Sequence, residues 1–251
     1  MRRTHIRLDD EDAAAYALLP GDPGRCQIIA SRLDDARHVL SHREYTTYAG
    51  TLQGERVLVT STGIGGPSTA IAVEELSTLG VHTLIRVGTC GSMREEITEG
   101  NVVIATGAAR DEGTSHQYLP PGMPAIAHFD VVLALRDAAL AADVRHTLGV
   151  VVTTDSFYAQ RDTATMPLGD RLAAKWRAWQ ASGCVAAEME TATLLAVATA
   201  RGLRAGSVLA VIDRIAPVLT PMPPPDRLPI APTIDVAVDA LRRLIALAGK
   251  K

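Results

Sequence analysis

Two glutamates flank a methionine at Glu188-Met189-Glu190, immediately before the helix-forming run Thr191–Ala198. A carboxylate at such a junction can accept hydrogen bonds from two neighbouring hydroxyls, and its charge favours a cation that develops on a sugar ring. A glutamate in a first helical turn also interacts favourably with the helix dipole and needs no further role for that. The triplet therefore indicates a sugar-binding site only if other segments support it.

A second group of residues has the chemistry to bind an anion. Gly21 follows an apolar run and lets the backbone approach a ligand closely, while Arg25 adds positive charge in the first turn of the next predicted helix. The segment lacks the Gly-Lys-Ser/Thr ending of a P-loop, so a nucleotide polyphosphate is disfavoured. An ordinary strand–turn–helix connection is the alternative.

Arg86 interrupts an apolar run and is followed by Gly88 and Thr89. A charged side chain within a β-strand is costly unless a partner neutralises it. A bound phosphate is one such partner, with the Thr89 hydroxyl as a further donor, and a structural pair with a glutamate is the other. Arg43 is a candidate third cation, or alternatively a solvated surface arginine. Three arginines and a threonine suit a small dianion.

Short β-branched runs alternate with longer helical runs along the chain. The predicted strands are Tyr16–Leu19, Ala36–Leu40, Arg56–Ser61, Thr83–Val87, Asn101–Thr106, His146–Thr153 and Ser207–Ile212. The predicted helices are Arg25–Arg32, Pro67–Leu79, Asp130–Ala142, Leu168–Ala181, Glu190–Arg201 and Thr233–Ala248. This alternation predicts the α/β class, with a parallel or mixed sheet and helices outside it. The stretch Pro217–Pro232 holds half of the fourteen prolines and is predicted to be an extended loop, either a site lid or a surface crossing.

Composition restricts the partners and the compartment. The 251 residues fit one compact domain, 1–251, with a hydrophobic fraction of 47%. A net charge of −3 without a Lys/Arg cluster argues against nucleic acid as a partner. Cys26, Cys90 and Cys184 lie far apart, as expected for reduced, cytoplasmic thiols. Neither a signal peptide nor a run that could span a bilayer is recognisable, so we expect no membrane partner.

Six motifs occur in a fixed order along the chain. They are Gly-Asp-Pro-x-Arg at 21–25, Ser-His-Arg-Glu-Tyr at 41–45, Thr-Gly-Ile-Gly-Gly-Pro-Ser at 62–68, Arg-Val-Gly-Thr-Cys-Gly at 86–91, Asp-Ser-Phe-Tyr at 155–158 and Glu-Met-Glu at 188–190. Together they resemble the nucleoside phosphorylase-I family, and within it the uridine phosphorylase-like, hexameric branch that also holds purine nucleoside phosphorylases. The similarity runs from His5 to Arg214, and the ordered set is far more specific than any single motif.

The resemblance implies a three-layer α/β/α fold around a mixed, partly barrel-like sheet, and a hexamer built as a trimer of dimers. It also implies reversible phosphorolysis, in which a nucleoside and inorganic phosphate give a free base and a pentose 1-phosphate. Phosphate is then a co-substrate, and the chemistry needs neither an organic cofactor nor a catalytic metal.

The resemblance further assigns roles to matching positions. The implied phosphate ligands are Gly21, Arg25, Arg86, Thr89 and, lent by the neighbouring subunit, Arg43. The implied ribose ligands are Glu188, Met189, Glu190 and, from across the dimer, His5. Positions where relatives hold a monovalent cation such as potassium between subunits are Glu44, Ile64 and Ser68. Phe157 is expected to stack against the base, and the residues expected to act in catalysis are Arg86, Glu190 and Asp213.

Two departures from the family pattern concern the base. Uridine phosphorylases carry Gly-Gln-x-Arg shortly after Phe-Tyr, whereas this chain has Gln160 and Arg161 in a shorter segment, where they can still contact the base in another geometry. Uracil-binding relatives also carry Asn-Arg near the last strand, whereas this chain has Asp213 and Arg214. An aspartic acid there can protonate purine N7 and improve the leaving group, unless it only pairs with an arginine.

Both departures favour a purine nucleoside phosphorylase. Three alternatives stay open: a uridine phosphorylase, a nucleosidase that uses water in place of phosphate, and a nucleoside-binding protein without catalysis. The nucleosidase predicts base release in phosphate-free buffer, which separates it from both phosphorylases.

Overall fold

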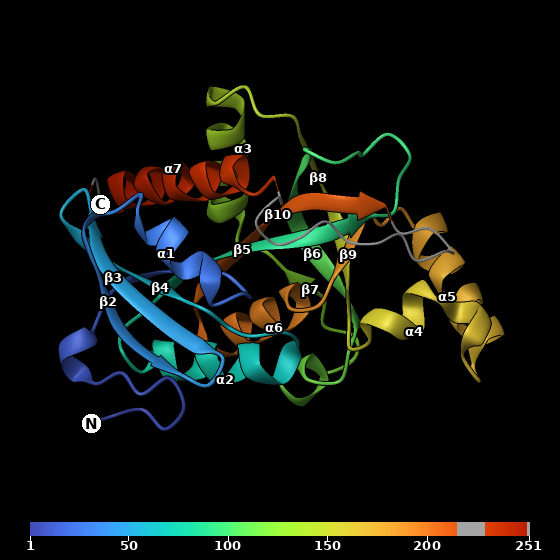
Figure 1. Ribbon diagram of the computed structural model, residues 1–251, viewed down its shortest axis with the longest axis horizontal. Helices are drawn as coiled ribbons and strands as arrows, with labels where there is room; N and C mark the ends of the chain where they lie inside the picture. Colours follow the sequence, from blue (N-terminus) through green and yellow to red (C-terminus); the bar gives the residue numbers. More distant parts are fainter. Residues whose placement is uncertain (215–228, 250–251) are drawn as a thin grey trace.

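The computed structural model describes residues 1–214 and 229–249, without the side chains of Gln160 and Arg161 (Figure 1). The predicted loop at Pro217–Pro232 therefore lies mostly outside the described residues. Within them, helices surround a large mixed sheet (Figure 1).

The strands of the described residues form one sheet that partly closes on itself. In chain order they are β1 (Tyr16–Leu19), β2 (Asp34–His42), β3 (Tyr45–Leu52), β4 (Glu55–Thr60), β5 (Thr83–Ser92), β6 (Val102–Asp111), β7 (Ala125–Ile126), β8 (His146–Thr154), β9 (Ala186–Glu188) and β10 (Arg204–Arg214). Strands β5, β10, β6, β8 and β9 pair in this order, and β9 pairs with β5 again, so these five form a closed mixed barrel. Strands β1, β4, β3 and β2 extend the sheet from β5.

Helices cover the sheet on both sides (Figure 1). They are α1 (Gly24–Ala30), α2 (Gly66–Ser77), α3 (Phe129–Ala141), α4 (Phe157–Arg161), α5 (Gly169–Ala181), α6 (Thr191–Arg201) and α7 (Ala231–Ala248). Helices α3 and α7 pack together on one side, and α2 and α6 pack together on the opposite side. The predicted α/β class with a mixed, partly barrel-like sheet is confirmed. Among the described residues, every helix is too short or too polar to cross a bilayer.

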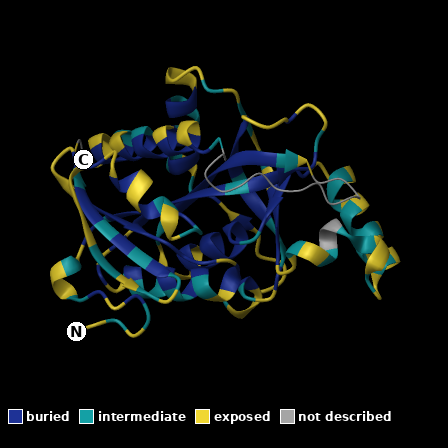
Figure 2. Cartoon of the chain, in the orientation of Figure 1, coloured by how far each residue is buried: buried dark blue, intermediate teal, exposed yellow. Residues whose placement is uncertain are grey.

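The core lies in and around the barrel strands, whereas exposed residues lie on the outer faces of the helices (Figure 2). Strand β5 is buried along nearly its whole length, which explains the apolar run in its sequence. Arg86 is the one charged residue of this strand and is itself buried. The fold thus places a cation inside the barrel wall, where it needs partners.

Every strand and helix predicted from the sequence is present; β1 has the predicted bounds, and the others have one or both ends shifted. Strand β3 was not predicted because its threonines and Gly50 give it a polar appearance, although it pairs with β2 on one side and β4 on the other. Helix α7 begins at Ala231, before the predicted Thr233. Pro232 lies in its first turn, where the missing N–H costs no helical hydrogen bond.

One carboxylate anchors the amino-terminal segment to α2. Glu75 accepts hydrogen bonds from the backbone N–H groups of His5 (3.0 Å) and Ile6 (2.8 Å), and its Oε1 lies 2.7 Å from His5 Nδ1. Burial by itself would raise the pKa of Glu75, but these contacts outweigh burial, and the pKa lies below its usual value. The ionised carboxylate therefore holds His5 and Ile6 in place.

Glu75→Gln is expected to loosen this segment in a pH-dependent way. A neutral amide is a weaker acceptor, so the Ile6 N–H should exchange with deuterium about tenfold faster at neutral pH. Because the folded pKa of Glu75 is depressed, its contribution is present above the pKa of the unfolded chain and is lost as the pH falls through the folded value. The difference between the two proteins should therefore shrink as the pH falls below the ordinary pKa of a glutamate.

The matched control is Glu74→Gln, because the Glu74 carboxylate binds Arg201 instead. It should leave exchange at Ile6 unchanged. Equal protection of Ile6 in wild type and Glu75→Gln at neutral pH would contradict the anchoring role.

Candidate active site

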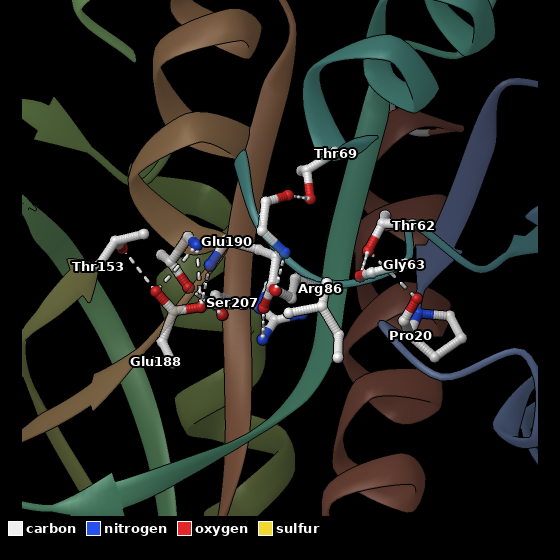
Figure 3. Close-up of polar contacts among 12 residues, drawn as sticks. Pro20, Thr62, Gly63, Thr69, Arg86, Thr153, Glu188, Glu190 and Ser207 are labelled. Carbon is white, nitrogen blue, oxygen red and sulfur yellow. Dashed lines mark hydrogen bonds and ion pairs between the residues drawn. The ribbon is translucent and has the colours of Figure 1, made fainter. Parts of the chain in front are cut away.

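Arg86 lies at the centre of a buried ion-pair cluster (Figure 3). Its Nε is 3.0 Å from Glu188 Oε2, and its Nη2 is 2.5 Å from Glu190 Oε2. None of the three side chains is more than 6% exposed. The pairing with glutamate considered from the sequence is therefore present. It uses two of the five N–H donors that an arginine carries.

A glycine two residues further along allows the guanidinium to lie here. A Cβ atom on Gly88 would be 2.7 Å from both Cζ and Nη2 of Arg86, so any side chain there displaces the guanidinium. Burial by itself would lower the pKa of Arg86, but the charges of Glu190 and Glu188 outweigh burial and raise it. Arg86 is thus a permanent cation with a fixed orientation.

The two glutamates of the cluster have different donors. Glu188 accepts from Thr153 Oγ1 (2.5 Å) and from the backbone N–H groups of Glu190 and Thr191 (2.9 Å each). Glu190 Oε1 accepts from the Gly65 N–H (2.5 Å), where α2 begins. Burial raises the pKa of Glu190 in spite of the neighbouring arginine. The junction of β9 and α6 and the start of α2 together fix both carboxylates.

A second arginine lies close to the cluster. Arg25 is in the first turn of α1, with Nε 3.7 Å from Asp22 Oδ2. Burial lowers the pKa of Arg25, Asp22 partly offsets this, and the nearby charge of Arg86 lowers it further. A Cβ atom on Gly21 would lie 3.8 Å from Arg86 Nη1, so this turn borders the same guanidinium. Two neighbouring cations beside an open backbone form a suitable anion site.

Thr89 and Asp213 lie on adjacent barrel strands near the cluster. Thr89 is half-buried on β5, and Asp213 is half-buried on β10, just beyond a register shift. Burial raises the pKa of the Cys90 thiol, as do the charges of Glu188 and Asp213. Asp213 is therefore close enough to act electrostatically on the same end of the barrel.

A cavity of about 620 Å³ adjoins the cluster. Its lining residues come from the start of α2, the segment after β6, the end of β8 and the start of α6, and they are Ile64, Gly65, Pro67, Gly113, Thr114, Gln117, Asp155 and Met189. The volume is typical of a small-molecule site. Two of these lining residues adjoin the cluster, because the Gly65 N–H donates to Glu190 and Met189 directly precedes Glu190 in sequence. The cavity and the cluster therefore share a wall.

Three predicted site residues have other surroundings in the single chain. His5 is bound to Glu75, and Arg43 is exposed in the two-residue turn between β2 and β3. Arg214 pairs with Glu95 at the surface, with Nη2 2.6 Å from Oε1. The predicted roles of Arg43 in phosphate binding and of His5 in ribose binding require a neighbouring subunit and stay predictions.

Three of the residues predicted to bind the base, Phe157, Gln160 and Arg161, lie on α4, whereas Asp213 and Arg214 end β10. Phe157 begins this helix and packs edge-to-face against Tyr158, with ring centroids 5.2 Å apart. The side chains of Gln160 and Arg161 lie outside the described residues. The base-binding roles of these residues stay predictions.

The three residues predicted to hold a monovalent cation converge around Gly63. A Cβ atom on Gly63 would be 2.8 Å from Glu44 Cγ and 3.3 Å from Ser68 Oγ. The Ser68 hydroxyl lies 3.3 Å from the Ile64 carbonyl oxygen. Carboxylate, hydroxyl and carbonyl oxygens are the ligands that hard cations prefer, so the donor types suit such an ion, and its identity as potassium stays a prediction.

The sequence profile of the phosphorylase superfamily matches residues 15–246. The chain belongs to the phosphorylase superfamily. It is 51% identical over 208 residues to the uridine phosphorylase of Treponema pallidum (strain Nichols), covering 83% of this chain and 81% of that protein. It is 38% identical over 246 residues to the uridine phosphorylase of Klebsiella aerogenes, covering 96% and 97%. It is 39% identical over 210 residues to the guanosine phosphorylase of Halorubrum lacusprofundi, covering 84% and 83%.

These findings confirm the resemblance and the enzyme class: the chain is a nucleoside phosphorylase, a pentosyltransferase.

Three residues that support the phosphorylase site were missed from the sequence. Thr153 and Gly65 donate to the two glutamates, and Glu75 holds His5. The sequence offered only weak signals for two of them: Thr153 ends a predicted strand, and Gly65 precedes a predicted helix. Nothing in the sequence distinguishes Glu75 from other glutamates on an amphipathic helix.

Gly88→Ala is expected to displace Arg86 from the cluster. The added Cβ meets the guanidinium carbon at 2.7 Å and breaks at least one charged hydrogen bond. The free energy of unfolding should fall by about 1–3 kcal/mol, measured by urea denaturation. Gly122→Ala is the control, because its added Cβ meets nothing within 4 Å, and it should change stability by less than about 0.5 kcal/mol. Equal stability of the two variants would refute this account of Gly88.

Proposed function

We propose that this phosphorylase cleaves uridine with inorganic phosphate, giving uracil and ribose 1-phosphate. The choice of uracil as the base is supported by the relatives from Treponema pallidum and Klebsiella aerogenes, which are uridine phosphorylases. The observation that carries the reaction type is the position of Arg86, fixed beside Glu190 and close to Arg25. Such an arrangement suits a dianion next to a sugar.

Phosphate binds between the two arginines. Within the described residues, Arg86 uses only two N–H groups on protein acceptors, so three are available to the anion. Gly21 gives the anion room at the backbone, and the Thr89 hydroxyl supplies a further donor. The site therefore neutralises a dianion with hydrogen bonds of fixed direction.

The ribose binds against Met189 and Glu190. Glu190 accepts from the Gly65 N–H on Oε1 and forms an ion pair with Arg86 through Oε2, which leaves lone pairs for the sugar hydroxyls. As the glycosidic bond lengthens, positive charge develops on the ribose, where the phosphate dianion and Glu190 stabilise it. A phosphate oxygen then bonds to the anomeric carbon, and the base leaves with the electron pair of the broken bond.

The active unit in this proposal is a homo-oligomer, a hexamer built as a trimer of dimers. His5 and Arg43 of a neighbour would complete each site, and Glu44, Ile64 and Ser68 would hold a potassium ion between subunits. Partial exposure of His5 and exposure of Arg43 in the single chain support this assignment. Analytical ultracentrifugation tests the assembly.

A purine nucleoside is the second candidate substrate. By the family resemblance, Asp213 stands where uracil-binding relatives are expected to carry asparagine, and a carboxylic acid there can protonate purine N7. The guanosine phosphorylase relative shows that the family accommodates purines at comparable identity.

The deciding experiment measures base release from uridine, inosine, guanosine and adenosine, each with and without phosphate, by chromatography. We expect phosphate-dependent release of uracil above all other bases. Preferred release of a purine would replace uridine by the second candidate, and release without phosphate would indicate a nucleosidase.

Asp213→Asn tests the leaving-group role directly. If uridine is the substrate, no nitrogen equivalent to N7 needs a proton, so kcat/KM for uridine should change by less than about threefold. If a purine is the substrate, loss of the acid should lower kcat/KM for that purine by about 100-fold. Asp155→Asn, which alters another carboxylate near the cavity, is the control for general effects of lost charge.

A further inference from the structure

Glu188 is more fully enclosed than a ligand-binding carboxylate should be. Its side chain is 1% exposed. Its oxygens accept from Arg86 Nε (3.0 Å), Thr153 Oγ1 (2.5 Å) and the N–H groups of Glu190 and Thr191 (2.9 Å each). A carboxylate offers about four lone-pair directions, so these donors leave none for a sugar hydroxyl.

Glu190 differs in this respect, although it has the same side chain two residues away. Its Oε1 accepts a hydrogen bond from the Gly65 N–H, and its Oε2 forms an ion pair with Arg86. Lone pairs therefore remain on both oxygens. The donor sets of the two glutamates indicate two different roles.

The donors of Glu188 come from three separate elements. Thr153 is on β8, Thr191 begins α6, and Arg86 is on β5. The Thr153 hydroxyl also accepts the N–H of Ala192, so it fixes the first turn of α6 as well. The positive end of α6 favours the carboxylate at this place. Glu188 is therefore held in place by the first turn of α6, and it in turn fixes the orientation of the Arg86 guanidinium.

We propose that Glu188 is a positioning residue that orients Arg86 for phosphate, in place of the ribose contact implied by the family resemblance. This inference rests on the proposed phosphorolysis. Because Glu188 holds Nε, the opposite edge of the guanidinium faces the Gly21 turn, where a Cβ atom would lie 3.8 Å from Nη1. Without that restraint, Arg86 can turn to bind Glu190 with two N–H groups and withdraw from the anion.

The test compares Glu188→Gln with the matched variant Glu190→Gln in steady-state kinetics. We expect Glu188→Gln to raise KM for phosphate about tenfold or more and to leave KM for the nucleoside within about twofold. Glu190→Gln should mainly raise KM for the nucleoside. If Glu188→Gln raises KM for the nucleoside and leaves that for phosphate unchanged, Glu188 contacts the ribose and the proposal is wrong.

A double-mutant cycle with Arg86→Lys distinguishes positioning from a general structural effect, because lysine keeps the charge but has no Nε. In the Arg86→Lys background, Glu188→Gln should change KM for phosphate by less than about twofold. Multiplicative effects of the two changes would overturn the proposal. If Glu188→Gln does not fold, Thr153→Val removes one donor to the carboxylate and should shift KM for phosphate in the same direction by a smaller factor.

The two proposals fail in distinguishable ways. Wild-type enzyme that releases no base in a phosphate-dependent manner contradicts the proposed function. Equilibrium dialysis with labelled inorganic phosphate then tests Glu188 without turnover. Weaker phosphate binding by Glu188→Gln than by wild type supports the positioning role, and equal binding contradicts it.

Discussion

A guanidinium inside a barrel wall is the constraint on which the rest of the site depends. Desolvation of Arg86 is costly, and the two carboxylates that neutralise it are themselves buried. Buried ion pairs of this kind contribute little to stability, because desolvation offsets most of their attraction. Their value here is a cation that stays charged and keeps one orientation, with part of its hydrogen-bonding capacity left for an anion.

This constraint explains several features of the surrounding fold. The starts of α2 and α6 supply N–H groups to Glu190 and Glu188, so the polar ends of two helices support carboxylates that would otherwise be unsatisfied. Gly65 adopts a φ of 93°, a conformation that glycine reaches without strain, as it directs its N–H to Glu190. Gly88 leaves space for the guanidinium itself. Glycine is thus required at these two positions for different physical reasons: backbone conformation at Gly65 and space at Gly88.

Much of this arrangement could be predicted from the sequence, for identifiable reasons. The alternation of β-branched and helical runs predicted the α/β class, and a lone arginine in an apolar strand indicated a buried charge with a partner. What the sequence could not provide is which donors saturate which carboxylate. Nothing in the sequence distinguishes Glu188 from Glu190. They differ only in the folded structure, where distant elements place Thr153 beside Glu188 and Gly65 beside Glu190.

Base preference was harder to predict because most of the residues predicted to contact the base lie in a different part of the molecule. The charged cluster belongs to the barrel and the helix starts, whereas Phe157 and its neighbours lie on the short helix α4 outside the barrel. Residues in such a segment can change without disturbing Arg86 or its glutamates, since no hydrogen bond of the cluster involves α4 within the described residues. The same phosphate and ribose chemistry can therefore serve uracil or a purine. Asp213, also predicted to act on the base, is the exception, because it lies on a barrel strand and its charge raises the pKa of the Cys90 thiol next to Thr89.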